Sequence, residues 1–546
     1  MPQKFRDWLA GHPNWALALA TIAVFAPFLA KPFNIDDPLF VWGAGQVQLH
    51  PANPFGFDVN WYDTAEPMWS VTENPPLACY FIALVATIFG RSETALHCAF
   101  LIPAIAAVLG THRLAKVFCS RPWLAALATL LTPVFLVSGT TVMCDMLLLA
   151  FWIWALVFWV EGLERTDSWR LTFAALLVSL AFLTKYFGIC LLPLLAVHGA
   201  ARMRRRGKWL LFLLPPLAVM VAYQSAMFAL YGQELFTAAA GYASFARDFF
   251  GFSKPLMCLT ALVFTGGCAA TAVLFAPLLW SRRTLVIFCA AAGLAAAALF
   301  SAGHAALPGA FAGLAVKIQF IFWLAGGISV LTLAVADFFR RRDAASLLLG
   351  LWVTGTFVFA AFFNWSVNGR SLLPLVPAVA ILLVCRLEQN QVAPRRLAVP
   401  LTAAALLALL VGRADFLQAM AVRENVTQIL IKHLRTPGPV WFQGHWGFQF
   451  YMQSFGALPL DLKHPGLRPG DKMVVPQANT DLKALNPETT VLLDTVTTGE
   501  PGWLSTWNQK TGAGFYASSG GPLPFAFGLA PPEQSLVYQL KPVVAP

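Results

Sequence analysis

The sequence predicts an all-α polytopic membrane protein that carries a soluble α/β domain at its C-terminal end. Of its 546 residues, 58% are hydrophobic and only 12% are charged, whereas soluble domains carry about 25% charged residues. Apolar runs of membrane-spanning length recur as far as residue 412, and the composition becomes more polar after that point. We therefore divide the chain into a transmembrane domain, residues 1–413, and a soluble domain, residues 414–546.

The transmembrane domain contains about thirteen apolar segments, some of them shorter than the ~20 residues that a helix needs to cross a bilayer. The first is interpreted as a transmembrane helix and not as a cleaved signal, with Lys4 and Arg6 held on the inner side. The predicted helices occupy residues 14–30, 93–111, 122–138, 145–160, 170–184, 187–201, 209–230, 256–280, 284–302, 317–336, 344–363, 371–385 and 397–412.

One further apolar run, residues 75–90, is left out of this set. As a helix it is roughly 24 Å long, short of a ~30 Å hydrocarbon core, and its placement decides the side of every later loop. If it lies on the outer leaflet, our count places 20 Lys and Arg residues inside and 8 in the short outer segments. Basic residues favour the cytoplasmic side, so we predict a cytoplasmic N-terminus and an extracytoplasmic C-terminal domain. The clusters at 202–208, 282–283 and 340–342 then lie inside.

The net charge of +11 has the same explanation, because the basic residues form short clusters between apolar runs. This pattern orients helices in a membrane, and it gives no support for nucleic acid as a partner. The nine cysteines show no metal-ligand spacing, so neither zinc nor a disulfide framework is predicted. We expect an integral membrane protein.

This topology places an acidic loop outside, within an outer loop and surface helix that together cover residues 31–92. The stretch 31–76 holds six of the 26 acidic residues of the chain, and it lies between apolar segments. Such acids are either solvated on a wet loop or functional. The acids are Asp36, Asp37, Asp58, Asp63, Glu66 and Glu73, and the same face receives Asp145, Lys185, Arg247, Lys254, Lys317 and Arg370.

The C-terminal domain has strand-like runs at 439–443, 472–476 and 490–494, and a helix-like stretch at 449–455. Gly, Pro, Asn and Thr separate these runs, as in turns. The motif Gly444-His445-Trp446-Gly447-Phe448-Gln449 stands out there, but His and aromatic side chains in such a setting are more typical of the fold than of a site.

Two acidic sites in the outer loop are candidates for chemistry. Asp36 and Asp37 follow the first helix directly, where adjacent carboxylates can act as a base and its partner or ligate a divalent ion. The alternative is a helix end held at the membrane interface. Glu73 precedes Pro75-Pro76, which can start the surface helix, so it is either a second site carboxylate or a helix cap.

Three further residues are expected on the same side. Asp145 lies between two predicted helices and is either a cap or a support for the acidic loop. Lys185 and Arg370 are cations at outer helix ends, against the usual charge bias, and this favours an anionic ligand such as a lipid phosphate. The alternative for each cation is snorkelling to phospholipid headgroups.

These motifs together resemble the GT-C glycosyltransferases of the superfamily that includes the dolichyl-phosphate-mannose protein mannosyltransferases and the lipid A aminoarabinose transferases. The resemblance covers roughly residues 15–380. It rests on the acidic pair after the first helix, the Pro-Pro-Leu surface helix, a polar helix exit followed by Asp145-Met-Leu-Leu, a Leu-Thr-Lys turn and Arg370-x-Leu-Leu-Pro.

The resemblance implies an inverting transferase that moves a sugar from a polyprenyl-phosphate donor to a lipid, protein or glycan acceptor on the outer face of the membrane. It implies Asp36 as the base, Glu73 as a second site carboxylate, and Lys185 and Arg370 as ligands of the donor phosphate. Membrane lipid is a further partner. The chain has Asp37 where the family usually has Glu, and Asn74 where it often has His or Lys. These departures leave the acceptor class open, and a divalent metal is possible but not required.

Two other classes of protein remain as alternatives. A secondary transporter or lipid flippase is expected to bury charges in mid-helix and to contain inverted repeats, neither of which the sequence displays. A non-catalytic scaffold that presents residues 414–546 is expected to tolerate the loss of Asp36.

Overall fold

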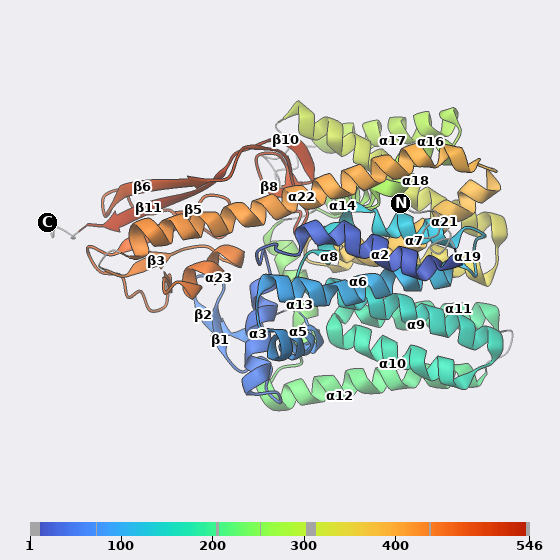
Figure 1. Ribbon diagram of the computed structural model, residues 1–546, viewed down its shortest axis with the longest axis horizontal. Helices are drawn as coiled ribbons and strands as arrows, with labels where there is room; N and C mark the ends of the chain where they lie inside the picture. The colour runs from blue at the N-terminus through green and yellow to red at the C-terminus, as the bar shows by residue number, and fades with distance from the viewer. Residues whose placement is uncertain are drawn as a thin grey trace.

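The computed structural model describes residues 11–72, 74–203, 207–251, 253–301, 313–435 and 438–541. It is an elongated molecule in which a bundle of helices fills one end and a strand-rich region fills the other (Figure 1). The helix α22 (Ala398–Ile429) joins the two parts, because it runs along the bundle and continues into the strand-rich region (Figure 1). The boundary predicted at residue 413 therefore lies inside a continuous helix, and the division into two domains stays a prediction.

Helices occupy all thirteen predicted segments over their described residues, but fewer of them qualify as membrane spans. Within the described ranges, eight helices are long and apolar enough to cross a membrane, and two bent helix pairs raise the number to ten. The predicted count of about thirteen crossings stays a prediction. The eight are Glu93–Ala115 (α6), Asp145–Arg165 (α9), Lys208–Tyr231 (α12 with its first turn), Arg282–Ser301 (α17), Leu314–Arg341 (α18), Ala344–Phe363 (α19 and its last turn), Gly369–Gln389 (α20 and α21) and Pro394–Leu434 (α22 with its flanking turns).

Shorter apolar helices complete the bundle. They cover Pro13–Phe28 (α2 and a following turn), Ser168–Thr184 (α10) and Tyr186–Arg202 (α11 and a preceding turn). The bent pairs are α7 (Pro122–Leu130) with α8 (Pro133–Gly139), and α13 (Leu235–Phe249) with α14 (Lys254–Cys268). The axis turns by 61° between α7 and α8, where Pro133 cannot donate the hydrogen bond that would continue the first helix.

The predicted surface helix forms as α5 (Leu77–Phe89). Its 13 residues make it roughly 20 Å long, short of a ~30 Å hydrocarbon core. Its small side chains are buried, and α5 packs chiefly against α3 (Asp37–Leu49), whereas Leu84, Ile88 and Phe89 are exposed. Both helices lie at the end of the bundle that faces the strand-rich region, beside β1 (Asp58–Asn60) and β2 (Ala65–Pro67) (Figure 1). This placement agrees with a helix that does not span.

The strand-rich region is built around a five-stranded sheet in the order β4-β3-β5-β11-β6. The central strand β5 pairs in parallel with β3 and antiparallel with β11, so the sheet is mixed. Val426 and Ile429 of α22 pack against it, together with Phe448 of α23. The predicted strands are found as β3 (Val440–Phe442), β5 (Lys472–Pro476) and β6 (Thr490–Thr498), and the predicted helix as α23 (Trp446–Ser454); the remaining strands are β4 (Leu458–Pro459), β7 (Gly502–Ser505), β8 (Trp507–Asn508), β9 (Ala513–Gly514), β10 (Ala526–Ala530) and β11 (Glu533–Leu540).

One part of the C-terminal region returns to the helical bundle. Residues 511–526 are almost entirely buried, and β8 and β10 lie where the two ends of the molecule meet (Figure 1). The Gly369 N–H donates to the Phe515 carbonyl, with 2.8 Å between N and O. The Phe525 ring packs edge-on against Trp323 of α18, with 5.2 Å between ring centroids. The segment 511–526 is therefore part of the core of the bundle.

Labelling of introduced cysteines in intact cells tests the predicted topology. We expect a cysteine at Lys463 to react with an impermeant maleimide in intact cells, and a cysteine at Arg283 to react only after permeabilisation, because both side chains are exposed but lie on opposite sides of the predicted membrane. The residues 204–206, also predicted inside, lie outside the described residues. Reaction of Lys463→Cys only after permeabilisation would refute the topology.

Candidate active site

The site is organised by the turn between α2 and α3, where two adjacent aspartates face in different directions. Ile35 has φ +49°, a conformation that is costly for a β-branched residue and that turns the chain sharply before Asp36. Asp36 precedes α3, yet its side chain makes no capping hydrogen bond. Asp37 opens the helix and is completely buried. The two carboxylates therefore have separate environments.

Asp36 pairs with Arg370 of α20 (Gly369–Leu372). The Asp36 Oδ2 atom lies 2.8 Å from Arg370 Nη2, and the carboxylate keeps about a quarter of its surface exposed. The Arg370 Nη1 atom lies 2.8 Å from Met143 Sδ, and its Nε–H has no hydrogen-bond partner among the described residues. The structure thus brings together a partly accessible acid and a cation that were both predicted as site residues.

Asp145 and Lys185 form a second pair beside the first. Lys185 follows α10, and its Nζ atom lies 2.6 Å from Asp145 Oδ1. Asp145 is the first residue of α9, and one of its carboxylate oxygens is engaged by this ion pair. Its Oδ2 atom is buried without a hydrogen-bond partner among the described residues. Arg370 also acts electrostatically on Asp145, which places both pairs in one cluster.

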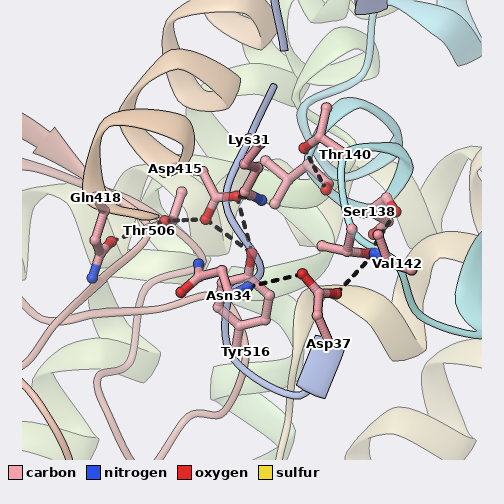
Figure 2. Close-up of polar contacts among 12 residues, drawn as sticks. Lys31, Asn34, Asp37, Ser138, Thr140, Val142, Asp415, Gln418, Thr506 and Tyr516 are labelled. Atoms are coloured by element: carbon pink, nitrogen blue, oxygen red, sulfur yellow. Dashed lines mark hydrogen bonds and ion pairs between the residues drawn. The ribbon is translucent and has the colours of Figure 1, made fainter. Parts of the chain in front are cut away.

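Asp37 holds the acidic turn against the helix break that follows α8. Its Oδ1 atom accepts a hydrogen bond from the Val142 N–H at 2.8 Å, and its Oδ2 atom accepts one from the Asn34 N–H at 2.9 Å (Figure 2). Burial raises the pKa of Asp37 to about 7, against the opposing effects of the Lys31 ammonium and the two N–H donors. Its full burial favours a role as a support for the turn, and the predicted catalytic role of Asp37 stays a prediction.

Glu73 lies outside the described residues, so its predicted role stays untested. The next residue, Asn74, is close to the cluster, because its Oδ1 atom lies 3.5 Å from the Sγ atom of Cys144. The chain at residue 74 therefore passes beside Asp145. Among the described residues, no group of three or more His, Cys, Asp or Glu side chains could hold a metal ion.

A second buried network, which the sequence did not predict, lies behind Asp37. Lys31 and Asp415 form an ion pair in which neither side chain is exposed (Figure 2). Asp415 also accepts hydrogen bonds from Thr506 Oγ1 at 2.7 Å and from the Tyr516 hydroxyl at 2.9 Å. One signal was available, since Asp415 follows an apolar helix and ionisable residues at such depth are commonly functional. Its partners could not be found, because they are separated from it by 91 to 384 positions.

The motif at 444–449 packs directly on the acidic turn. A Cβ atom on Gly447 would lie 2.1 Å from the Phe33 carbonyl oxygen, so only glycine permits this contact. His445 lies against the Trp61 ring, with 5.1 Å between centroids, and burial lowers its pKa to about 4. These contacts are structural, as expected for the motif. They pack it against the turn on which Asp36 lies.

A family model matches the first half of the bundle. Residues 73–224 match the model described as dolichyl-phosphate-mannose-protein mannosyltransferase. This range includes Asp145 and Lys185, and it begins at Glu73, whereas Asp36 and Arg370 lie outside it. No curated protein matches the chain at a significant level.

Solved structures of membrane glycosyltransferases are similar to the chain at low identity. ArnT from Cupriavidus metallidurans bound to undecaprenyl phosphate is 16% identical with a TM-score of 0.38, over 85% of this chain and 94% of that one. The arabinofuranosyltransferase AftD from Mycobacteria is 13% identical with a TM-score of 0.36, over 98% and 40% of the two chains. The arabinosyltransferase EmbB from Mycobacterium smegmatis is 14% identical with a TM-score of 0.34, over 92% and 47%.

The resemblance predicted from the sequence is thus confirmed over residues 73–224, which are similar to the dolichyl-phosphate-mannose-protein mannosyltransferase family.

Proposed function

We propose that the protein transfers a sugar from a polyprenyl-phosphate donor to a lipid, protein or glycan acceptor, with inversion, on the outer face of the inner membrane. The observation that carries this proposal is the cluster of two ion pairs, Asp36 with Arg370 and Asp145 with Lys185. It lies at the start of α3, at the end of the helical bundle that faces the strand-rich region (Figure 1).

The chemistry of such a transfer requires one base and one set of cations. The acceptor oxygen forms a bond to the anomeric carbon of the sugar, while the bond from that carbon to the phosphate oxygen breaks. The proton of the acceptor hydroxyl goes to Asp36, which is the partly exposed carboxylate of the acidic pair. The phosphate leaves as an anion and needs no acid, unlike the leaving group in glycoside hydrolysis.

Lys185 and Arg370 are the groups that stabilise the negative charge on the leaving phosphate. Each of them already forms an ion pair with a carboxylate, so the cluster contains two positive and two negative charges. A donor phosphate competes with Asp36 for the N–H groups of Arg370. Binding of the donor therefore weakens the hold of Arg370 on the base and leaves the Asp36 carboxylate free to accept a proton.

The remaining predicted residues take supporting roles in this proposal. Asp145 orients Lys185 through the 2.6 Å contact, and Asp37 positions the turn that carries Asp36. Glu73 remains a second site carboxylate by resemblance. The predicted orientation, with the N-terminus cytoplasmic and the C-terminal region outside, places the whole cluster on the outer side.

Removal of each cation tests the assignment of the donor site. A hydrogen bond to a charged group contributes about 1.5–3 kcal/mol, so we expect Lys185→Ala and Arg370→Ala to raise the donor KM by roughly 10- to 100-fold. Lys185→Arg is expected to rescue only in part, because the two cations differ in geometry. The measurement is initial rate against concentration of a purified polyprenyl-phosphate sugar.

Lys317→Ala is the matched control for these variants. Lys317 is a cation predicted at the same end of the bundle, but it lies against the Phe300 ring and outside the cluster. Its removal is expected to leave the donor KM unchanged. An unchanged donor KM in both Lys185→Ala and Arg370→Ala would mean that these cations serve phospholipid headgroups, and it would refute the proposed donor site.

A further inference from the structure

The buried segment 511–526 is a glycine-rich loop with little room to move. The Gly514 N–H donates to the Leu523 carbonyl at 2.8 Å, and the Leu523 N–H donates to the Gly512 carbonyl at 3.0 Å. A Cβ atom on Gly521 would lie 2.2 Å from the backbone of Gly512, so the two limbs of the loop are in direct contact. The Ser518 N–H reaches across to the Val367 carbonyl at 2.8 Å. This contact fixes the loop against the turn that precedes Arg370.

Tyr516 is the residue of this loop that meets the candidate active site. Its side chain is buried, and the guanidinium carbon of Arg370 lies over its ring, 5.7 Å from the centroid. Its hydroxyl donates to Asp415, with 2.9 Å to Oδ1 and 3.0 Å to Oδ2. Burial raises the pKa of Tyr516 well above its usual range, so the hydroxyl keeps the proton that it donates.

The acceptor of that hydrogen bond is itself held in place. The Lys31 ammonium pairs with Asp415 from the other side, and Thr506 donates to it (Figure 2). The carbonyl of Lys31 accepts a hydrogen bond from His97 Nε2 at 2.9 Å, which ties this end of α2 to α6. The ring of Tyr516 is therefore anchored at its hydroxyl to Asp415 of α22, which Lys31 and Thr506 hold in place.

Few other groups could fix the orientation of the guanidinium plane of Arg370. Among the described residues, Asp36 is the carboxylate with which it pairs, the Met143 sulfur is a weak acceptor, and its Nε–H has no partner. A cation over an aromatic face is attracted by the ring, and this attraction grows where water is excluded. The Tyr516 ring can thus orient the guanidinium while its N–H groups face the carboxylate or the phosphate.

We propose that Tyr516 is a positioning residue for Arg370, so that the C-terminal segment 511–526 completes the donor-phosphate site. The inference rests on the proposed function, because it takes Arg370 as a ligand of that phosphate. It gives the C-terminal region a part in catalysis that is distinct from acceptor binding.

Replacement of the ring at position 516 tests the proposal. A cation–π contact contributes about 0.5–2 kcal/mol, so Tyr516→Leu is expected to raise the donor KM by roughly 3- to 30-fold, with a smaller change in kcat. Tyr516→Phe keeps the ring and is expected to stay within about 3-fold of the wild type, the lower bound of the same contact. Phe525→Leu is the matched control, because Phe525 is an equally buried aromatic of the same segment that packs on Trp323 and not on Arg370.

Combination with Arg370→Ala separates positioning from a general effect on folding. If Tyr516 acts through Arg370, Tyr516→Leu adds nothing to the donor KM of the Arg370→Ala enzyme. Independent, multiplying effects of the two substitutions would overturn the inference. An unchanged donor KM in Arg370→Ala alone would instead refute the proposed phosphate site, so the two failures can be told apart.

Fluorinated phenylalanines at position 516 give a second measurement if Tyr516→Leu does not fold. Fluorine withdraws electron density from the face of the ring and keeps its shape nearly constant. The logarithm of the donor KM is expected to rise stepwise from Phe to monofluoro- and trifluoro-Phe. A flat series would show that the ring fills space without orienting Arg370, and it would overturn the proposal.

Discussion

Replacing Asp36 by asparagine is expected to lower kcat by about 10²–10⁴-fold, which is the usual contribution of a general base. The acceptor hydroxyl is far too weak an acid to ionise near neutral pH, so its proton must leave as the new bond forms. Asparagine keeps the size of the side chain and cannot take that proton. It still accepts a hydrogen bond from Arg370, but it no longer competes with the phosphate as an anion, so the donor KM is expected to stay equal or fall.

Asp37→Asn is the matched control, because it is the same substitution one residue further along. The Asp37 carboxylate accepts two backbone N–H groups, and an amide has only one oxygen to offer them. An unsatisfied buried donor costs about 1–3 kcal/mol, so the main effect is expected on stability, with a smaller loss of kcat. Single-turnover rates with saturating donor separate the two effects.

Two outcomes would contradict this assignment. Full turnover in Asp36→Asn with a large loss in Asp37→Asn would exchange the roles of the two residues. Normal turnover in both variants and in Glu73→Gln, with purified donor and acceptor, would reject the acidic loop as the catalytic element. It would favour instead a scaffold or a transporter in which these acids are structural.

The sequence was sufficient to predict that the charged site residues lie at one end of the bundle, because that prediction depends on topology alone. Once the basic clusters set the side of each loop, Asp36, Asp145, Lys185 and Arg370 had to lie at one end of the bundle. The structure brings all four into one cluster. Helices at the predicted segments follow from the same physics, since every polar backbone group in a bilayer must be satisfied within its own helix. Arg340, Arg386 and Asp337 gather around Trp280, and we expect them at the other end.

The divergence of Asp36 and Asp37 could be anticipated only in outline. Adjacent side chains at the start of a helix must point in different directions, but nothing in the local pattern says which one faces Arg370. The answer depends on the positive φ of Ile35 and on the Val142 N–H, which the break after α8 exposes. Both are tertiary features. The sequence accordingly treated the pair as two catalytic candidates, and the structure gives them different partners: Arg370 for Asp36, and two backbone N–H groups for Asp37.

The packing of segment 511–526 into the bundle could not be predicted from the sequence, because it too depends on tertiary contacts. Its glycines and prolines were typical of turns in a separate domain, and a boundary at residue 413 followed from the change in composition. Composition reports the average surroundings of a stretch. It does not report that α22 continues through the boundary, or that Gly369 and Phe515 share a hydrogen bond. Contacts over such separations leave no periodic signal in one sequence.

Breaking the buried pair of Lys31 and Asp415 is expected to have the largest effect on stability. Loss of one partner leaves an uncompensated charge in the interior, at a cost of about 3–5 kcal/mol. Lys31→Met and Asp415→Leu are each expected to lower the midpoint of thermal unfolding in detergent well below that of the wild type. Lys432→Met is the matched control, because Lys432 pairs with Asp494 on the surface, where an ion pair contributes about 1 kcal/mol or less.

The double variant distinguishes a charge effect from a loss of packing. With both charges removed, Lys31→Met with Asp415→Leu leaves neither partner of this pair as an uncompensated buried charge, so its midpoint is expected to lie above that of either single variant. Recovery is expected to be incomplete, since the hydroxyls of Thr506 and Tyr516 lose their acceptor. Single variants as stable as the wild type, or a double variant with additive losses, would show that the pair does not hold the C-terminal segment in the bundle.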